Sequence, residues 1–182
     1  LPNTSLAAMR DAMVPLIAPL LARHHMVWLG GDHSITLPLL RAYKAHLGRP
    51  LAVLHFDAHC DTWKDHFGEP SGHGTWVYEA IEEGLVVREC FMQVGIRSAG
   101  ERSAREYVCD QGGAIYTARD LRGLESPAQL APVIDDLRHR IARHGAERMA
   151  QEKLVRLGQM ATSVAISDMD PSTQNMVMGA FG

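Results

Sequence analysis

The sequence has little cysteine and no long apolar run. Its three cysteines, Cys60, Cys90 and Cys109, are odd in number and widely spaced along 182 residues. Such spacing argues against a disulfide framework and predicts reduced thiols in a cytoplasmic protein. No apolar run reaches the length of about 18 residues typical of a membrane-spanning helix, and no stretch has the pattern of a signal peptide. We therefore expect a cytoplasmic chain with no membrane partner.

Strong charge of either sign is also missing. The formal net charge is -3, and the basic residues are scattered, so nucleic acid is not expected as a partner. A GxSxG nucleophile elbow, a Walker A loop and a complete dinucleotide fingerprint are absent. Internal repeats and low-complexity tracts are absent as well. These absences leave serine-hydrolase, P-loop and dinucleotide-dependent chemistry without support.

What the sequence does contain is the composition of a globular domain. Hydrophobic residues make up 46% and charged residues 21% of a chain long enough for one domain with its own core. Amphipathic and apolar stretches alternate, in the order helix, strand, helix, strand. Because this order implies right-handed crossovers between parallel strands, we expect an α/β fold of three layers with a mainly parallel sheet.

Periodicity and turn residues place the individual elements. Strands are expected at residues 26–29, 51–56, 90–96, 114–117 and 162–166. Helices are expected at residues 6–24, 36–47, 75–83, 101–110, 127–144 and 146–157. Pro15 and Pro19 lie inside the first helix, and each removes a backbone donor, so we expect a kink there or two short helices.

The most informative stretch reads LAVLHFDAHCD. Its first part, Leu51–Phe56, is apolar without alternation, which is typical of a strand buried on both faces. It runs into Asp57, His59 and Asp61, three metal-competent side chains at every second position. On an extended chain the first and last of these would lie roughly 13 Å apart, too far to share one ion. Either the chain curls beyond the strand, or two ions share the ligands; both suit the carboxyl end of a parallel strand.

The alternative interpretation of this stretch is a strand followed by a solvated polar turn. Three regularly spaced donors directly after a buried strand favour a metal site instead. Oxygen-rich donors with a little imidazole favour a hard or borderline divalent ion such as Mn²⁺. The cysteines are too dispersed for a thiolate zinc site, and Cys60, out of register with the donors, is predicted to serve packing.

Two other histidines are candidates for the same region. His33 follows a predicted strand and a Gly-Gly turn, so it also lies at the carboxyl end of a strand. Taken alone, it is more typical of a turn or cap residue than of a ligand. His73 lies in a glycine-rich loop of the kind that carries catalytic groups. Taken alone, it is an ordinary exposed loop histidine.

Three motifs together resemble those of the ureohydrolases, the arginase/agmatinase family of binuclear manganese enzymes. In chain order they are Gly30-Gly31-Asp32-His33-Ser34, Phe56-Asp57-Ala58-His59-Cys60-Asp61 and Ser71-Gly72-His73-Gly74-Thr75. The similarity runs from about Met26 to Gly145 and is greatest to agmatinases. It implies an arginase/deacetylase-like fold, a homo-oligomer, and a single domain with a family-like part, 1–145, and a divergent segment, 146–182.

The resemblance also implies roles for individual residues. His33, Asp57, His59 and Asp61 match four of the family's metal ligands, with Asp57 bridging two Mn²⁺ ions. His73 matches the active-site histidine assigned to substrate contact or proton shuttling. The implied reaction is metal-assisted hydrolysis of a small guanidino compound, in which hydroxide attacks the guanidinium carbon and releases urea and an amine.

Agmatine is the expected substrate, and its product would be putrescine, a polyamine. The loop after the central strand offers Asp65 and Glu69, which fit a distal amine better than the α-carboxylate of arginine. A guanidinobutyrase, an arginase or a more distant deacetylase of the same fold stays an alternative.

The C-terminal end departs from the family pattern. A second metal motif, Ser-x-Asp-x-Asp-x-x-Asp-Pro, is expected soon after Gly145, but the one candidate, Ser167–Pro171, is shortened and displaced. We therefore expect a fold that is incomplete at its C-terminal end, apparently truncated or rearranged, and holding one or two Mn²⁺ ions. Whether Asp168 and Asp170 replace the missing motif stays open. So does the alternative of an inactive homologue that retains partial metal binding.

Overall fold

The computed structural model describes residues 5–65 and 67–144. The strands are β1 (Leu51–Phe56), β2 (Val86–Ile96) and β3 (Ala114–Thr117). The helices are α1 (Leu6–Leu21), the 3₁₀ turn η1 (His33–Ile35), α2 (Thr36–Leu47), α3 (Trp76–Glu82), α4 (Arg102–Arg105), α5 (Tyr107–Asp110) and α6 (Pro127–Arg143). The helix expected at 146–157 and the strand expected at 162–166 lie outside the described residues.

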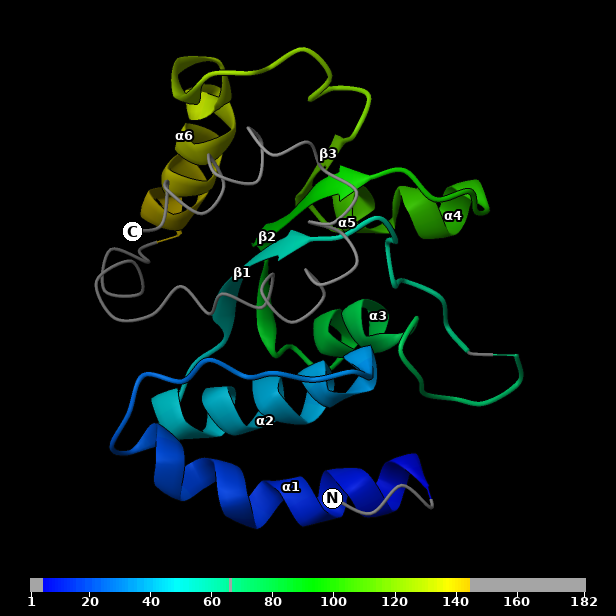
Figure 1. Cartoon of the computed structure of the whole chain (residues 1–182), viewed down its shortest axis with the longest axis vertical. Helices are drawn as coiled ribbons and strands as arrows, with labels where there is room; N and C mark the ends of the chain where they lie inside the picture. Colours follow the sequence, from blue (N-terminus) through cyan, green and yellow to red (C-terminus); the bar gives the residue numbers. More distant parts are fainter. Residues whose placement is uncertain (1–4, 66, 145–182) are drawn as a thin grey trace.

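The sheet is parallel and covered on both faces, which confirms the expected α/β class (Figure 1). Its strand order is β1-β2-β3, and both neighbouring pairs are parallel. Successive residues of β1 point to opposite faces. Leu51 and Val53 join an apolar core with α1, α2 and α3, whereas Ala52 and Leu54 join a second core with α6. Helices, sheet and helix thus form three layers, and α1 packs outside α2.

The helix α1 runs unbroken from Leu6 to Leu21, so the expectation of two short helices is wrong. Pro15 and Pro19 lie four residues apart on the exposed side of the helix. The carbonyl groups that lose a backbone donor there face water, which can take the place of the missing hydrogen bonds. The buried stripe consists of Met13, Ile17 and Leu21, also spaced by four, and it anchors the helix against α2.

Residues 26–29 do not form the expected strand. They have no regular structure and pair with no described strand. The side chains of Val27 and Leu29 are 65% and 86% exposed, although both are apolar. A strand is defined by hydrogen bonds to a neighbour, and an apolar pattern by itself does not supply that neighbour. The expectation at 26–29 is therefore wrong for the described structure.

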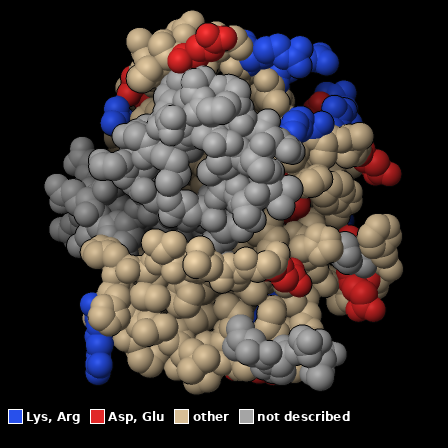
Figure 2. All heavy atoms as spheres, viewed as in Figure 1, with Lys and Arg blue, Asp and Glu red and all other residues tan. Residues whose placement is uncertain are grey.

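Charge is spread thinly over the surface. Figure 2 shows Lys and Arg interspersed with Asp and Glu on one face of the molecule, while much of its lower part, over α1 and α2, carries neither. The exposed apolar side chains of α1 are Val14, Leu16 and Leu20. Together with those of residues 26–29, they give this end of the molecule an apolar surface.

Gly113 tests the packing between α5 and the sheet. A Cβ at this position would lie 2.6 Å from the carbonyl oxygen of Phe91 and 2.7 Å from a methyl carbon of Val108. Because a backbone oxygen cannot retreat cheaply, we expect Gly113→Ala to lower the free energy of unfolding by about 1–3 kcal/mol. Urea unfolding of the full chain measures this. Gly100→Ala is the control, since its Cβ would make ordinary contacts at 3.5 and 3.6 Å. Equal losses in both variants would contradict the packing.

Candidate metal centre

A sharp turn at the end of β1 builds the candidate site. The backbone N–H of Asp57 still donates to Val94 of β2, at 3.1 Å, but the next carbonyl, that of Ala58, accepts from the N–H groups of Arg97 and Ser98. Asp61 then adopts a φ of +51°, in the left-handed region. Of the two possibilities raised by the spacing of the donors, the chain therefore does curl as it leaves the strand.

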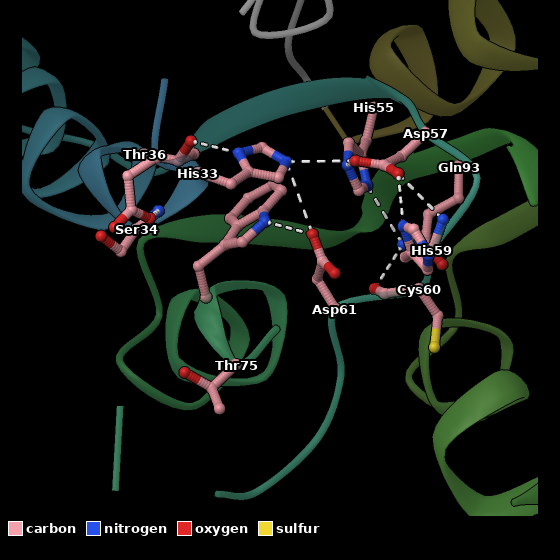
Figure 3. A network of polar contacts seen from close by, with 12 residues as sticks. His33, Ser34, Thr36, His55, Asp57, His59, Cys60, Asp61, Thr75 and Gln93 are labelled. Carbon is pink, nitrogen blue, oxygen red and sulfur yellow. Dashed lines mark hydrogen bonds and ion pairs between the residues drawn. The ribbon is translucent and has the colours of Figure 1, made fainter. Parts of the chain in front are cut away.

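Four side chains converge where the chain curls (Figure 3). His33, His55, Asp57 and Asp61 each offer a ligand atom, and these atoms lie within 4.8 Å of one another. His33 Nε2 lies 3.2 Å from Asp57 Oδ2 and 3.4 Å from Asp61 Oδ2. Three of the residues predicted as metal ligands are thus brought together from η1 and from the end of β1. Their two carboxylates and one imidazole match the donor types that Mn²⁺ accepts.

The two nitrogens of the His33 ring face different surroundings. Its Nδ1 lies 3.0 Å from Thr36 Oγ1. Its Nε2 is buried, faces the carboxylates, and makes no hydrogen bond of good geometry with the described residues. A histidine that ligates a metal ordinarily engages its other ring nitrogen in a hydrogen bond. The geometry of His33 therefore fits a metal ligand.

His59 lies on the other side of Asp57. Its side chain is 62% exposed, and its Nδ1 is 3.5 Å from Asp57 Oδ1. The backbone N–H of His59 donates to the same oxygen at 2.8 Å. Asp57 thus presents Oδ2 to the buried cluster and Oδ1 to His59. A carboxylate with an imidazole near each oxygen has the arrangement that bridging two ions requires.

His73 is not part of the buried cluster. It is exposed in the loop between β1 and α3. Burial raises the pKa of Asp32, but hydrogen bonds from Ser34, followed by the charges of His73 and His33, bring that pKa below its ordinary value. His73 therefore lies on the side of the site where Asp32 opens η1, and its catalytic role stays a prediction.

Burial and mutual contact perturb all three groups of the inner cluster. Burial alone would raise the pKa of Asp57, but the contacts of its carboxylate with the imidazoles of His33 and His55 hold that pKa far below its usual range. Burial raises the pKa of Asp61 above its ordinary value, against the opposing effect of the neighbouring imidazoles of His55 and His33. For His33, burial lowers the pKa, but Asp57 and Asp61 outweigh it and raise the pKa overall. Such opposed shifts in one small space are typical of functional sites.

The sequence interpretation missed the residues that hold these carboxylates. The indole Nε1–H of Trp76, the first residue of α3, donates to Asp61 Oδ2 at 2.8 Å. His55 Nε2 lies 3.2 Å from Asp57 Oδ2, and its Nδ1 lies 3.1 Å from Gln93 Nε2 on β2. One signal was available, because His55 interrupts an apolar run two residues before Asp57 and so shares its face.

Gly95 shows why the backbone beside Asp57 requires glycine. Its φ is +93°, a conformation that residues with a Cβ rarely adopt, whereas an added Cβ would itself make only ordinary contact, 3.4 Å from the carbonyl oxygen of Asp57. The register of β2 against β3 shifts at this point, between Val94 and Ile96. The irregularity lets β2 follow the chain as it curls away from β1.

Fold and site together define an α/β protein with a candidate His/Asp metal site at the carboxyl end of β1. Residues 3–169 match the sequence model of the arginase family, and the chain belongs to that family. The match extends beyond the range of about Met26 to Gly145 on which the resemblance was based, in both directions.

Several relatives are similar to parts of the chain. The agmatinase of Chromobacterium violaceum is 52% identical over 73 residues, which are 40% of this chain and 23% of that protein. The agmatinase of an Enterobacter species is 43% identical over 121 residues, 65% of this chain and 36% of that protein. Proclavaminate amidino hydrolase from Streptomyces clavuligerus has a similar structure, with a TM-score of 0.66 and 28% identity, over 78% of this chain and 46% of that one. The chain therefore spans less than half the length of these relatives.

The structure also bears on two expectations drawn from absences. None of the helices within the described residues is long and apolar enough to cross a membrane. Cys60, Cys90 and Cys109 are free thiols, the first two buried and the third exposed. The predicted packing role of Cys60 agrees with its complete burial.

Asp57 is the residue whose loss tests the site most directly. Asp57→Asn keeps the volume of the side chain and removes the negative charge that faces His33, His55 and His59. We expect Mn²⁺ to bind at least about 100-fold more weakly, since even the partners of metal ligands are commonly worth 10–100-fold. Titration calorimetry of the full chain measures the affinity. Asp65→Asn is the matched control, an exposed carboxylate that accepts one hydrogen bond, from Gly68. Equal affinity of the two variants would place the ion elsewhere.

Proposed function

We propose that this chain carries the manganese site of a hydrolase that converts agmatine to putrescine and urea. The observation that carries the proposal is the contact of His33 with Asp57 and Asp61, in which the buried Nε2 of His33 faces both carboxylates. Membership of the arginase family supports a reaction on guanidino compounds. The similarity to bacterial agmatinases favours agmatine among them.

In this proposal each of the predicted site residues has a task. His33, Asp57 and Asp61 would hold an inner Mn²⁺, while His59 and the outer oxygen of Asp57 would hold a second. The bound metal would supply an activated water for attack on the guanidinium carbon. The exposed His73 lies in a loop that can contact solvent and substrate, where it would pass a proton to the leaving amine.

The argument for agmatine as the substrate comes from acidic residues in the loop after β1. Asp65 and Glu69 are both exposed there. Their carboxylates would attract the distal ammonium group of agmatine and repel the α-carboxylate of arginine. The side chain of Asp65 is already ordered by its hydrogen bond to the backbone N–H of Gly68.

The second candidate function is a homologue that binds metal without turnover. Of the residues predicted as ligands, three (His33, Asp57 and Asp61) lie at the inner position and two (Asp57 and His59) at the outer position. Dications held by few anions repel each other and retain more water. The choice between the active hydrolase and the inactive homologue depends on whether Asp168 and Asp170, outside the described residues, complete the outer position.

Assembly and location follow the same proposal. We place the protein in the cytoplasm, where free thiols such as the exposed Cys109 persist. A homo-oligomer is supported by the exposed apolar side chains of α1 and of residues 26–29, which an interface between copies would bury. We keep the description of one domain with a family-like part, 1–145, and a divergent segment, 146–182.

Manganese content separates the two candidate functions. We expect one Mn²⁺ per chain to survive reconstitution and desalting, because the inner position is buried and has three donors, and a second to bind only in excess metal. Elemental analysis measures the ratio. Two ions that survive desalting would mean that further ligands complete the outer position. A chain that retains no manganese would contradict the proposed site.

Urea release identifies the substrate. With excess Mn²⁺ we expect the full chain to release urea from agmatine faster than from arginine or 4-guanidinobutyrate, since the latter two carry a carboxylate that Asp65 and Glu69 would repel. A paired Asp65→Asn, Glu69→Gln variant should narrow the preference for agmatine over arginine. Faster turnover of arginine would refute the assignment of agmatine. Metal binding without urea from any of the three would favour the inactive homologue.

A further inference from the structure

His55 has two conceivable roles in the cluster. It is fully buried on β1, and its Nε2 lies 3.2 Å from Asp57 Oδ2, within the distance range of a further metal ligand. It could therefore bind the metal itself, or it could hold Asp57 in place. The position of the ring proton decides, because a ligating nitrogen offers a lone pair whereas a nitrogen that holds a carboxylate must donate.

Gln93 determines where that proton lies. Its Nε2 is 2.7 Å from the carbonyl oxygen of Cys60, which can only accept, so the amide turns its NH₂ group to that oxygen. The reversed amide would place two oxygens at this short distance. The same Nε2 is 3.1 Å from His55 Nδ1, which must therefore accept its second proton. A neutral imidazole carries one N–H, so the proton of His55 lies on Nε2 and points at Asp57 (Figure 3).

Packing keeps this chain of hydrogen bonds in one arrangement. The ring of His55 meets Trp76 edge-on at 4.8 Å between centroids and Phe91 at 6.3 Å. His55 and Gln93 are both 0% exposed, so solvent does not compete for their hydrogen bonds. The Oε1 of Gln93 has no hydrogen-bond partner among the described residues. The amide is therefore oriented by its two N–H groups alone.

We propose that His55 and Gln93 are positioning residues for Asp57, and that His55 is not a metal ligand. Gln93 fixes the His55 tautomer, and the Nε2–H of His55 then holds Asp57 Oδ2 toward His33. The positioning role rests on the proposed function, because it assumes that Asp57 binds Mn²⁺. The donors and acceptors assigned to His55 and Gln93 do not depend on that assumption. In the same way Trp76 holds Asp61, so each inner carboxylate has its own buried donor.

The tautomer is tested on the metal-free full chain. Long-range ¹H–¹⁵N spectra with labelled histidine distinguish the two neutral tautomers, and the His55→Gln spectrum assigns the signal. We expect a single Nε2–H form in the unsubstituted chain. We expect Gln93→Leu to mix the two tautomers, because the donor to Nδ1 is gone. An Nδ1–H tautomer, or a doubly protonated ring, in the unsubstituted chain would overturn the proposal.

Manganese affinity distinguishes positioning from ligation. His55→Met removes the donor at similar volume, and we expect Mn²⁺, followed by the EPR signal of the free ion, to bind about 10–100-fold more weakly. His55→Gln places an amide nitrogen near the former Nε2, so we expect it to restore affinity to within about threefold of the original. If His55 were a ligand, glutamine could not replace it, because its amide would donate to Asp57 and would not bind the ion. Both variants would then lose the same amount of Mn²⁺ affinity. That result would refute the proposal.

A matched variant separates these effects from simple destabilisation. Val53 is fully buried on the same face of β1, four residues before Asp57. Val53→Ala should lower the unfolding midpoint but leave the Mn²⁺ affinity of the folded chain unchanged. If it weakened Mn²⁺ binding as much as His55→Met, the effect would be structural and the positioning role would be wrong. An unsubstituted chain that binds no Mn²⁺ would contradict the proposed function, and the tautomer spectrum would still decide this inference.

Discussion

The approach of two carboxylates to one imidazole, in a place largely closed to water, is the constraint on which the rest of the site depends. Anions so placed lose hydration, and each needs a compensating donor or cation. Asp57 accepts hydrogen bonds from His55 and from the backbone N–H of His59, and Asp61 accepts one from the indole N–H of Trp76. These donors come from β1, from the turn that follows it and from α3. The turn thus depends on elements that pack around it.

The central position of β2 follows from the same constraint. It pairs with β1 on one side and β3 on the other, so both edges of the strand are occupied. Its Gln93 donates to the Nδ1 of His55, and its Gly95 adopts a φ of +93° beside Asp57. A strand that was needed only for packing would require neither an amide in the core nor a glycine at positive φ. Stability and site geometry therefore make different demands on neighbouring residues of β2.

Much of this could be predicted from the sequence, because the signals were local. The strand at residues 51–56 and the helix at 36–47 follow from apolar runs and glycines. His33 lies beside Asp57 and Asp61 as the family resemblance implies, although the strand expected before it does not form. What failed or was missed depends on partners that lie far away in the chain. Residues 26–29 have strand composition but no described neighbour, and the prolines of α1 are tolerated because of the face on which they lie. The link between His55 and Gln93 spans 38 positions that no spacing rule connects.

The two sides of Asp57 differ in a way that bears on how the site works. On the inner side its oxygen faces buried groups, where charges interact strongly because little water screens them. On the outer side it faces His59, whose side chain is 62% exposed, so solvent and salt screen interactions there. The described residues therefore concentrate their binding free energy for a cation on the inner side. Any group that strengthens the outer side has to supply carboxylates, since His59 contributes no negative charge.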